Sequence, residues 1–383
     1  MCVDMGDTTL VRAGRPSYTS YERIRPYMAR FTENRWTSAI IPALLIHIPI
    51  GTVYCWSVFI CYGAIMGIGL GVGYLTPVKN LMLWFADNKG LATGIAVAGF
   101  GLAKAIASPL MEYLIGTVGL VSMFFILAAV YAVMMFVGFL LIKRPAGWVY
   151  DPATSHVSRK TILKKPVFWG IWIAFYINIT CGLALISQEK DILHDVLRAF
   201  PQYANLSPAK FAAAISGIIG LVLAVDSVFN TAGRVGFSTL SDHLKRRETV
   251  YQVIFIMSIA VCLLQIFTNS IGNALLWAVL AMLFLVNAGY GGGFSTLPVL
   301  LDQHFGTKTV STTHGLTLSA WAFAGLSGNQ LASFVVAHAP DQAHRHAALI
   351  PVLTGLFVVA LISISLVKYL GDRNVTKAVE DRG

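Results

Sequence analysis

The sequence predicts an all-α integral membrane protein of about ten transmembrane helices, and three observations lead there. Of the 383 residues, 56% are hydrophobic and only 12% are charged, with a mean hydropathy of +0.69. Apolar stretches of roughly 18 to 25 residues recur along the chain between short polar segments. Lys and Arg gather in alternate loops, as expected of a chain that crosses a bilayer repeatedly.

Composition argues against several other classes of protein. The net charge of +10 is spread over many short loops and forms no basic patch with interleaved aromatics, so we expect no nucleic-acid partner. Residues 1–35 carry six arginines and four acids without an apolar core before a cleavage site, which indicates a cytoplasmic tail and not a signal peptide. No nucleophile elbow, zinc-binding helix motif or phosphate loop is present, so we expect neither an enzyme nor a cofactor or metal site.

The first apolar region is long enough for two spans. From Trp36 to Val78 there is no Asp, Glu, Lys or Arg, and a helix of that length would reach about 65 Å, twice the hydrocarbon core. Counted as two spans, it places 22 of the 28 Lys and Arg residues on the inner side, 4 on the outer side, and Lys104 and Arg234 within spans. Counted as one span, it places 10 Lys and Arg residues on the inner side and 16 on the outer side. The positive-inside rule therefore favours two spans and cytoplasmic termini.

The later spans follow from apolar stretches bounded by polar ones. In chain order, the ten predicted helices are 36–59, 60–79, 90–115, 119–142, 166–187, 209–237, 249–268, 273–297, 312–337 and 347–370. A turn is needed near residues 57–63, although that segment contains no Pro or Asn.

Several motifs resemble one transporter family. Gly63-Ala-Ile-Met-Gly-Ile-Gly-Leu-Gly-Val-Gly-Tyr74, followed by the stretch 84–101, resembles the fourth helix, inner loop and fifth helix of the oxalate/formate antiporter family. That family is part of the major facilitator superfamily and is close to the monocarboxylate transporters. Residues 51–59 resemble the family's first helix, 229–242 the end of its eighth, and 305–321 its eleventh.

The resemblance implies a major facilitator-type helical bundle from which two helices are missing. Family members have twelve helices, so helices two and three would be absent between about residues 59 and 62. The N-terminal half would then be 36–142 with four spans, and the C-terminal half 166–370 with six. A cytoplasmic loop, 143–165, would join them, and 371–383 would be a cytoplasmic tail.

The function implied is secondary active transport of a small organic anion, a mono- or dicarboxylate, by alternating access. Coupling could be to protons or to exchange, and the plasma membrane is favoured over an organelle. Besides the anion, the expected partners are protons and the lipid bilayer. The alternative is a non-transporting truncated form that acts as a sensor or partner-binding protein, or as a leak, because four helices packed against six could leave a slot open.

Three polar residues share one face of the predicted span 209–237. Asp226, Asn230 and Arg234 are spaced i, i+4, i+8 in otherwise apolar surroundings. A charge within a span costs about 2.5 to 3.5 kcal/mol, so such residues normally face a partner or a polar cavity. Arg234 matches the arginine of the family's eighth helix, which contacts the carboxylate substrate in the antiporters. An internal ion pair, or a gate at the inner mouth, is the alternative.

Lys104 and Asp226 lie at similar depths, about 20 and 22 Å from the inner ends of their helices. In the superfamily these two helices face each other, so we expect a Lys104–Asp226 pair that an anion or a proton would break; a static salt bridge is the alternative. Asp226 is the acid expected deep enough to carry a proton.

The family's second substrate-binding cation, a lysine on the eleventh helix, is missing. Trp321 stands at its position, and no Lys or Arg occurs from Ser311 to His338. A dicarboxylate would therefore be held by Lys104 with Arg234, or the substrate carries a single carboxylate.

Aromatic residues stand where the family lines its cavity: Tyr54, Tyr74 and Tyr290, with Trp321 beside such a position. Aromatic walls suit a small organic anion, and packing or interface anchoring is the alternative.

Two further features concern the loops. Asp242 and Arg246 match the acid and the final arginine of the superfamily's inner-loop pattern Gly-x-x-x-Asp-x-x-Gly-Arg, which predicts a gating role. The outer segment 338–346 contains three histidines and is expected to be a solvated loop, with a metal-binding tract as the alternative.

Overall fold

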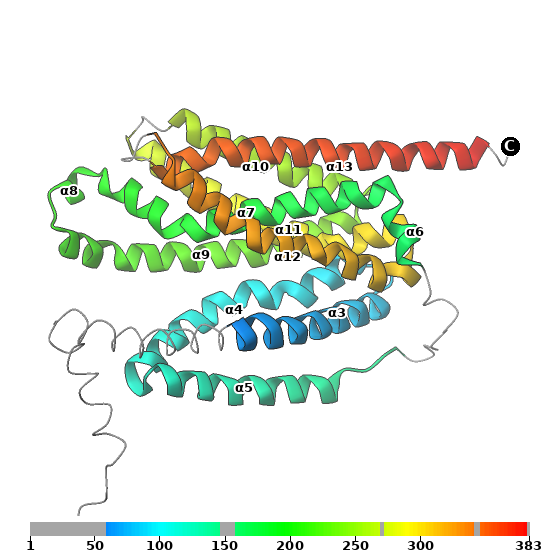
Figure 1. The fold of residues 1–383 in the computed structure, drawn as a ribbon, viewed down its shortest axis with the longest axis horizontal. Coiled ribbons are helices and arrows are strands. Elements are labelled where there is room, and N and C mark those ends of the chain that lie inside the picture. The colour runs from blue at the N-terminus through cyan, green and yellow to red at the C-terminus, as the bar shows by residue number, and fades with distance from the viewer. Residues whose placement is uncertain (1–58, 146–157, 269–271, 341–344, 381–383) are drawn as a thin grey trace, which may run out of the picture. The chain divides into compact units, whose positions relative to one another are not determined.

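The computed structural model describes residues 59–145, 158–268, 272–340 and 345–380, and within these ranges it is helical without strands (Figure 1). The long helices are α3 (Met66–Trp84), α4 (Lys89–Val118), α5 (Leu120–Leu141), α7 (Pro166–Arg198), α9 (Pro208–Asp242), α10 (Glu248–Thr268), α11 (Gly272–Phe305), α12 (Val310–Ala337) and α13 (Leu349–Glu380). Short helical turns are η1 (Phe59–Ile65), α6 (Arg159–Leu163), α8 (Pro201–Ala204), η3 (Thr307–Thr309) and η4 (Arg345–Ala348).

From residue 89 onward the predicted spans coincide with the observed long helices. Six of the helices in the described ranges, α5, α7, α9, α10, α11 and α13, are long and apolar enough to cross a membrane. The predicted class of all-α membrane protein is confirmed. From α4 onward, five helices continue past their predicted ends, and three of them do so by about eight residues or more, to Arg198, Phe305 and Glu380, because a helix that leaves the bilayer can go on in water. The expected tail 371–383 is therefore helical as far as Glu380.

The turn expected near residues 57–63 does not occur within its described part. Phe59–Ile65 forms a π-helical segment that runs directly into α3, so the predicted boundary between Phe59 and Ile60 is wrong. The segment lacks turn-forming Pro or Asn, and an apolar backbone keeps its hydrogen bonds in lipid only if it stays helical. The preceding predicted span, up to Val58, lies outside the described residues.

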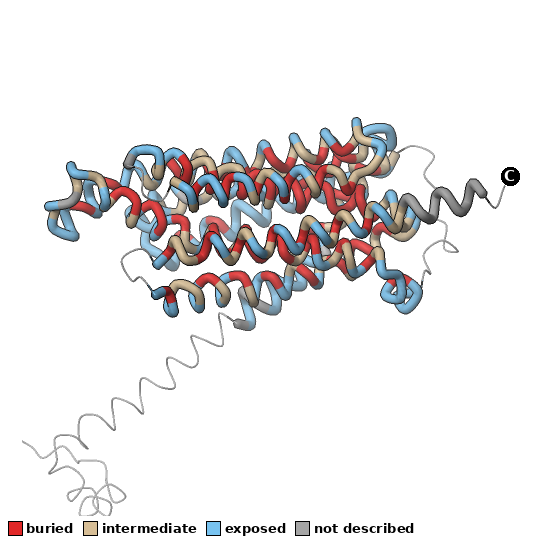
Figure 2. The backbone as a smooth tube through the Cα atoms, turned by 90° about the horizontal axis from the view of Figure 1, so that it is seen from above, coloured by how far each residue is buried: buried red, intermediate tan, exposed pale blue. Residues whose placement is uncertain are grey.

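The chain forms two compact units, Met1–Gly73 and Tyr74–Gly383. Within the second unit, α4 and α5 are joined by Gly119 alone, whose φ of 81° and ψ of 166° are open to glycine and not to residues with a side chain. α4 packs against α9 and α11, and α9 packs against α11. Buried residues recur along the inner faces of the helices, while the outer faces are exposed (Figure 2).

Small residues bring α4 and α9 close together. A Cβ atom added at Gly94 would lie 2.8 Å from the Arg234 carbonyl oxygen and would overlap the Ser238 hydroxyl. Gly101 is equally close to Asn230 and Thr231. Closely packed small residues are typical of membrane helix interfaces, and here they bring the backbone of α4 against the polar face of α9.

The three glycines 291–293 of α11 allow this helix to pack closely against α9 and α7. Added Cβ atoms would meet the Asn230 backbone at Gly291, the Phe237 ring at Gly292 and the Asn178 side chain at Gly293. α11 continues through this run without a break.

Candidate functional site

A cavity of about 210 Å³ lies between α4, α7, α9, α11 and α12. It is smaller than the roughly 300 to 1,000 Å³ typical of drug-sized ligands, so it suits a small solute. The lining residues are Phe100, Gly101, Ile186, Ser227, Asn230, Arg234, Asn287, Tyr290, Phe294 and Trp321. The structure thus brings together four residues predicted from the sequence, namely Asn230, Arg234, Tyr290 and Trp321.

Arg234 provides a positive charge in this cavity. Its residue surface is only 5% exposed, its Nε donates a 2.9 Å hydrogen bond to Asn230 Oδ1, and its Cζ lies 5.3 Å from the Phe294 ring centre and 5.9 Å from that of Phe100. Its buried Nη1 atom has no hydrogen-bond partner among the described residues. A buried guanidinium group with unused donors is well suited to bind a carboxylate.

Two amides connect this arginine to a buried acid. Asn230 receives the Arg234 hydrogen bond and donates from Nδ2 to Asn287 Oδ1 at 2.8 Å, and Asn287 Nδ2 donates in turn to Asp226 Oδ2. In each of these three hydrogen bonds the donor is on the Arg234 side and the acceptor on the Asp226 side. A change in hydrogen bonding at Arg234 can therefore be transmitted through the two amides to Asp226. We did not predict Asn287; a single amide in an otherwise apolar stretch of α11 was the available signal.

Asp226 is 1% exposed and lines a small cavity of about 10 Å³ together with Glu189, which is 2% exposed. The expectation that Asp226 is the one deep acid is therefore wrong. It failed because the predicted span ended at residue 187 and placed Glu189 outside the membrane. Lys104 belongs to α4, but its side chain lies outside the described residues, and its pairing with Asp226 stays a prediction.

The aromatic wall has two layers. Phe294 lies edge-on to Trp321 at 5.2 Å, and both line the cavity together with Phe100. Tyr74 is not a lining residue: its ring lies behind the wall, 5.8 Å from Phe100, 5.6 Å from Phe294 and 5.7 Å from His314. The predicted Tyr54 lies outside the described residues.

We did not predict the two phenylalanines of this wall. Phe294 could have been found from its position one helical turn after Tyr290, because residues i and i+4 share a face.

Asp242 lies at one end of the packed helices, and we call this the Asp242 end. The opposite end includes η4, and we call it the His346 end. The Asp242 carboxylate accepts 2.8 Å hydrogen bonds from the backbone amides of Gly90 and Leu91, in the first turn of α4. Asn88, at the N-cap position, makes no side-chain capping bond. An acid from α9 therefore caps the start of α4, where a helix has unpaired N–H groups and positive dipole charge. We call this contact the Asp242 latch.

Other charged contacts accompany the latch. Lys89 Nζ lies 2.8 Å from Asp302 Oδ2, near the end of α11, and Arg247 Nη2 lies 3.6 Å from Asp242 Oδ1. The ends of α4, α9 and α11 are therefore held together by charge pairs and hydrogen bonds.

Arg246, predicted with Asp242, has a different set of contacts. It forms a 2.8 Å ion pair with Glu248 and donates to the Lys368 carbonyl at 3.1 Å, and Glu248 also contacts His304 at 2.7 Å. These contacts connect the start of α10 to α11 and α13. The arginine beside the latch is Arg247, the next residue along the chain.

Residues 28–329 match the sequence profile of the Major Facilitator Superfamily. The chain belongs to this superfamily. The fold and superfamily predicted from the motifs are thereby confirmed.

Relatives of this superfamily member include three proteins at low identity. It is 26% identical over 260 residues to an uncharacterised MFS-type transporter, YhjX, of Escherichia coli, with 66% of this chain and 59% of the relative covered. It is 23% identical over 299 residues to an oxalate:formate antiporter of Oxalobacter formigenes, with 77% and 66% covered. It is 23% identical over 344 residues to apicoplast pyruvate carrier 1 of Toxoplasma gondii, with 73% and 58% covered. The chain thus spans less than two thirds of the length of each.

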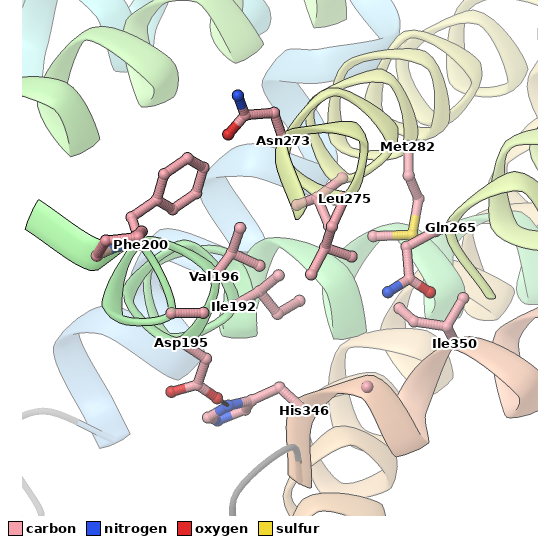
Figure 3. Close-up of a pocket in the computed structure, with 14 residues that line it drawn as sticks. Ile192, Asp195, Val196, Phe200, Gln265, Asn273, Leu275, Met282, His346 and Ile350 are labelled. Atoms are coloured by element: carbon pink, nitrogen blue, oxygen red, sulfur yellow. Dashed lines mark hydrogen bonds and ion pairs between the residues drawn. The ribbon is translucent and has the colours of Figure 1, made fainter. Parts of the chain in front are cut away.

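A second and larger cavity of about 320 Å³ lies at the His346 end of this superfamily member (Figure 3). Its described lining residues include Asp195, Gln265, Asn273 and His346, and none of those described is Lys or Arg. His346 is buried and its Nδ1 is hydrogen-bonded to Asp195, so the expectation of a solvated histidine loop is wrong at this residue. With Asp195 in its lining and no described Lys or Arg, this cavity suits a carboxylate less well than the Arg234 cavity does.

Proposed function

We propose that this chain carries a small organic anion with one or two carboxylates across a membrane by alternating access. The observation that carries the proposal is the buried Arg234 side chain, with an unused Nη1 donor, in a small aromatic-walled cavity. The comparisons support small-anion transport in general, since two relatives are named for oxalate and formate exchange and for carrying pyruvate.

The anion would bind with its carboxylate on Arg234. Charge-assisted pairing with a planar guanidinium is strong and directional. Among the described side chains that line the cavity, Arg234 is the one cation. A single carboxylate is therefore sufficient, and a dicarboxylate would need Lys104 as its second anchor.

Alternating access would use the interface between α4 and the C-terminal helices. The cavity lies along this interface, and the Asp242 latch closes one end of it. We propose that the Asp242 end faces the cytoplasm together with both termini, in the plasma membrane, because the basic loops fall on that side. Opening would then require the latch to break.

Coupling between the anion and a proton would run through the hydrogen-bonded side-chain amides of Asn230 and Asn287. When a carboxylate takes the Arg234 donors, Asn230 and Asn287 can reorient, and the hydrogen bond that Asn287 donates to Asp226 weakens. A proton would then bind to one of the two acids that line the small cavity, Asp226 or Glu189, which gives proton symport. Anion exchange would leave the acids in one protonation state throughout.

Transport by purified protein in proteoliposomes tests this function. We expect saturable uptake of labelled formate, oxalate or pyruvate, and a loss of roughly 30-fold or more in Arg234→Gln, because truncating one partner of a buried charge pair costs about 2 to 5 kcal/mol. Arg198→Gln is the matched control, since Arg198 lies at the His346 end against Phe211.

Equal uptake by the two variants would refute the assignment of Arg234. Linear, unsaturable flux would instead indicate a leak, and binding without flux would indicate a sensor.

A further inference from the structure

Three side chains at or near the cavity carry buried polar atoms that have no hydrogen-bond partner. Among the described residues these orphaned atoms are the Tyr74 hydroxyl, both ring nitrogens of His314, and Arg234 Nη1. Tyr74 is 4% exposed and His314 is fully buried. More than about 90% of buried polar groups are hydrogen-bonded, and an unsatisfied one is costly. A group of three such side chains in one place therefore indicates that something else binds them.

Arg234 and Tyr74 contact the same two rings, and His314 contacts Tyr74. Phe100 and Phe294 contact the guanidinium of Arg234, and both also contact the ring of Tyr74. Tyr74 in turn lies 5.7 Å from His314. Phe100 and Phe294 thus separate the cavity from a second polar layer formed by Tyr74 and His314.

This second layer lies toward the Asp242 end. His314 precedes Trp321 by seven residues on α12, or about 10 Å of helical rise, and α12 begins at the Asp242 end. A substrate that leaves the cavity in this direction has to pass the two phenylalanine rings and reach Tyr74 and His314.

We propose that Tyr74 and His314 form a second substrate subsite, which binds an uncharged hydrogen-bonding group of the anion while its carboxylate stays on Arg234. This inference rests on the proposed function. Phenol and neutral imidazole each provide both a donor and an acceptor, so they match a hydroxyl or a carbonyl oxygen better than a second carboxylate. The substrate class is then a monocarboxylate with a hydroxyl or oxo group close to its carboxylate.

Occupation of this subsite requires Phe100 and Phe294 to turn aside. Their rings contact Arg234 and Tyr74 and form no hydrogen bonds that would have to break. In the closed arrangement the polar atoms of Tyr74 and His314 have no hydrogen-bond partner among the described residues, and binding the substrate supplies such partners. The subsite therefore contributes most when the Asp242 end opens, which would help to move the anion out of the cavity.

The test compares lactate with propionate, which differ only in the 2-hydroxyl group. Uptake of labelled pyruvate into proteoliposomes is inhibited with each, and the ratio of their half-inhibitory concentrations measures recognition of the hydroxyl. We expect wild-type protein to favour lactate by about 3- to 10-fold, the range of one or two neutral hydrogen bonds. Tyr74→Phe and His314→Leu should bring this ratio toward one, while His314→Gln, which keeps a donor and an acceptor, should restore part of it.

Thr317→Val is the control on the same helix. The Thr317 hydroxyl is buried but already bonded to the Thr313 carbonyl at 2.8 Å, so the ratio should stay at the wild-type value. A ratio unchanged in Tyr74→Phe and His314→Leu, even with reduced uptake, would overturn the subsite and leave carboxylate transport standing. Wild-type protein that neither transports nor binds any carboxylate would overturn both proposals.

Discussion

Asp242→Asn should open the Asp242 end of the protein. The carboxylate accepts two 2.8 Å hydrogen bonds from the Gly90 and Leu91 amides and lies 3.6 Å from Arg247. Asparagine keeps one acceptor oxygen and turns its NH₂ group toward the other amide. A hydrogen bond to a charged group contributes about 1.5 to 3 kcal/mol, and 1.4 kcal/mol corresponds to a factor of ten. The ratio of molecules open at this end to molecules closed there should therefore rise by about 10- to 150-fold.

Thiol labelling measures this change. Ser241 is fully buried beside Gly90, so a Ser241→Cys reporter, in a background without the native cysteines, should react with maleimide only when the latch opens. The labelling rate should increase in Asp242→Asn by the factor above. Asp87→Asn is the matched control, because this acid is exposed in the loop before α4 and the substitution removes the same charge.

Equal labelling rates in the two variants would refute the latch. A second reporter, Ala332→Cys, tests whether the bundle as a whole has loosened, since Ala332 is fully buried in the half of α12 toward the His346 end. Its labelling should remain slow; faster labelling there would contradict an effect confined to the Asp242 end.

Three further predictions concern packing, the amide chain and topology. Gly94→Ala should destabilise the protein by about 1 to 3 kcal/mol through overpacking against α9, measured by unfolding in detergent, whereas Gly99→Ala, with nothing within 4 Å of the added Cβ, should be neutral. Asn287→Ala should lower the free energy of unfolding by about 1 to 3 kcal/mol for each partner left unsatisfied, and the exposed Asn273→Ala should not; equal stability would contradict the chain of donors. An impermeant amine reagent should label lysines in 143–165 only after cells are permeabilised, and labelling of intact cells would reverse the proposed topology.

Most of the helical architecture could be predicted because lipid restricts the options. A bilayer accepts only apolar segments of about 20 residues with internally bonded backbones, so the positions of the long helices from residue 89 onward could be predicted along the chain. One error fell beyond the end of a predicted span, where this restriction is weak, and the other fell within an apolar segment where a turn was expected. α7 continues to Arg198 beyond its predicted end and so carries Glu189 into the buried site, and Phe59–Ile65 stays helical where a turn was expected.

Residue spacing predicted the polar part of the candidate site on one helix only, whereas Tyr290 of α11 and Trp321 of α12 were predicted from the family resemblance. The i, i+4, i+8 spacing placed Asp226, Asn230 and Arg234 on one face, and the structure confirms that all three are buried. Their connection depends on Asn287, which is 57 residues from Asn230 and 61 from Asp226. Side chains this far apart in the chain meet only through packing of α9 against α11, on which local spacing carries no information.

The sequence by itself determined that this chain is embedded in a membrane, where its long helices from residue 89 onward lie, and that charge must be accommodated inside them, since these properties depend on composition and on periodicity within single segments. Only the tertiary structure decided that Asp242 caps α4, that Asn287 connects Asn230 to Asp226, and that Tyr74 lies between Phe294 and His314. The physical reason is that a hydrogen bond or ring contact requires atoms within a few ångströms, and between distant segments that proximity is set by helix packing.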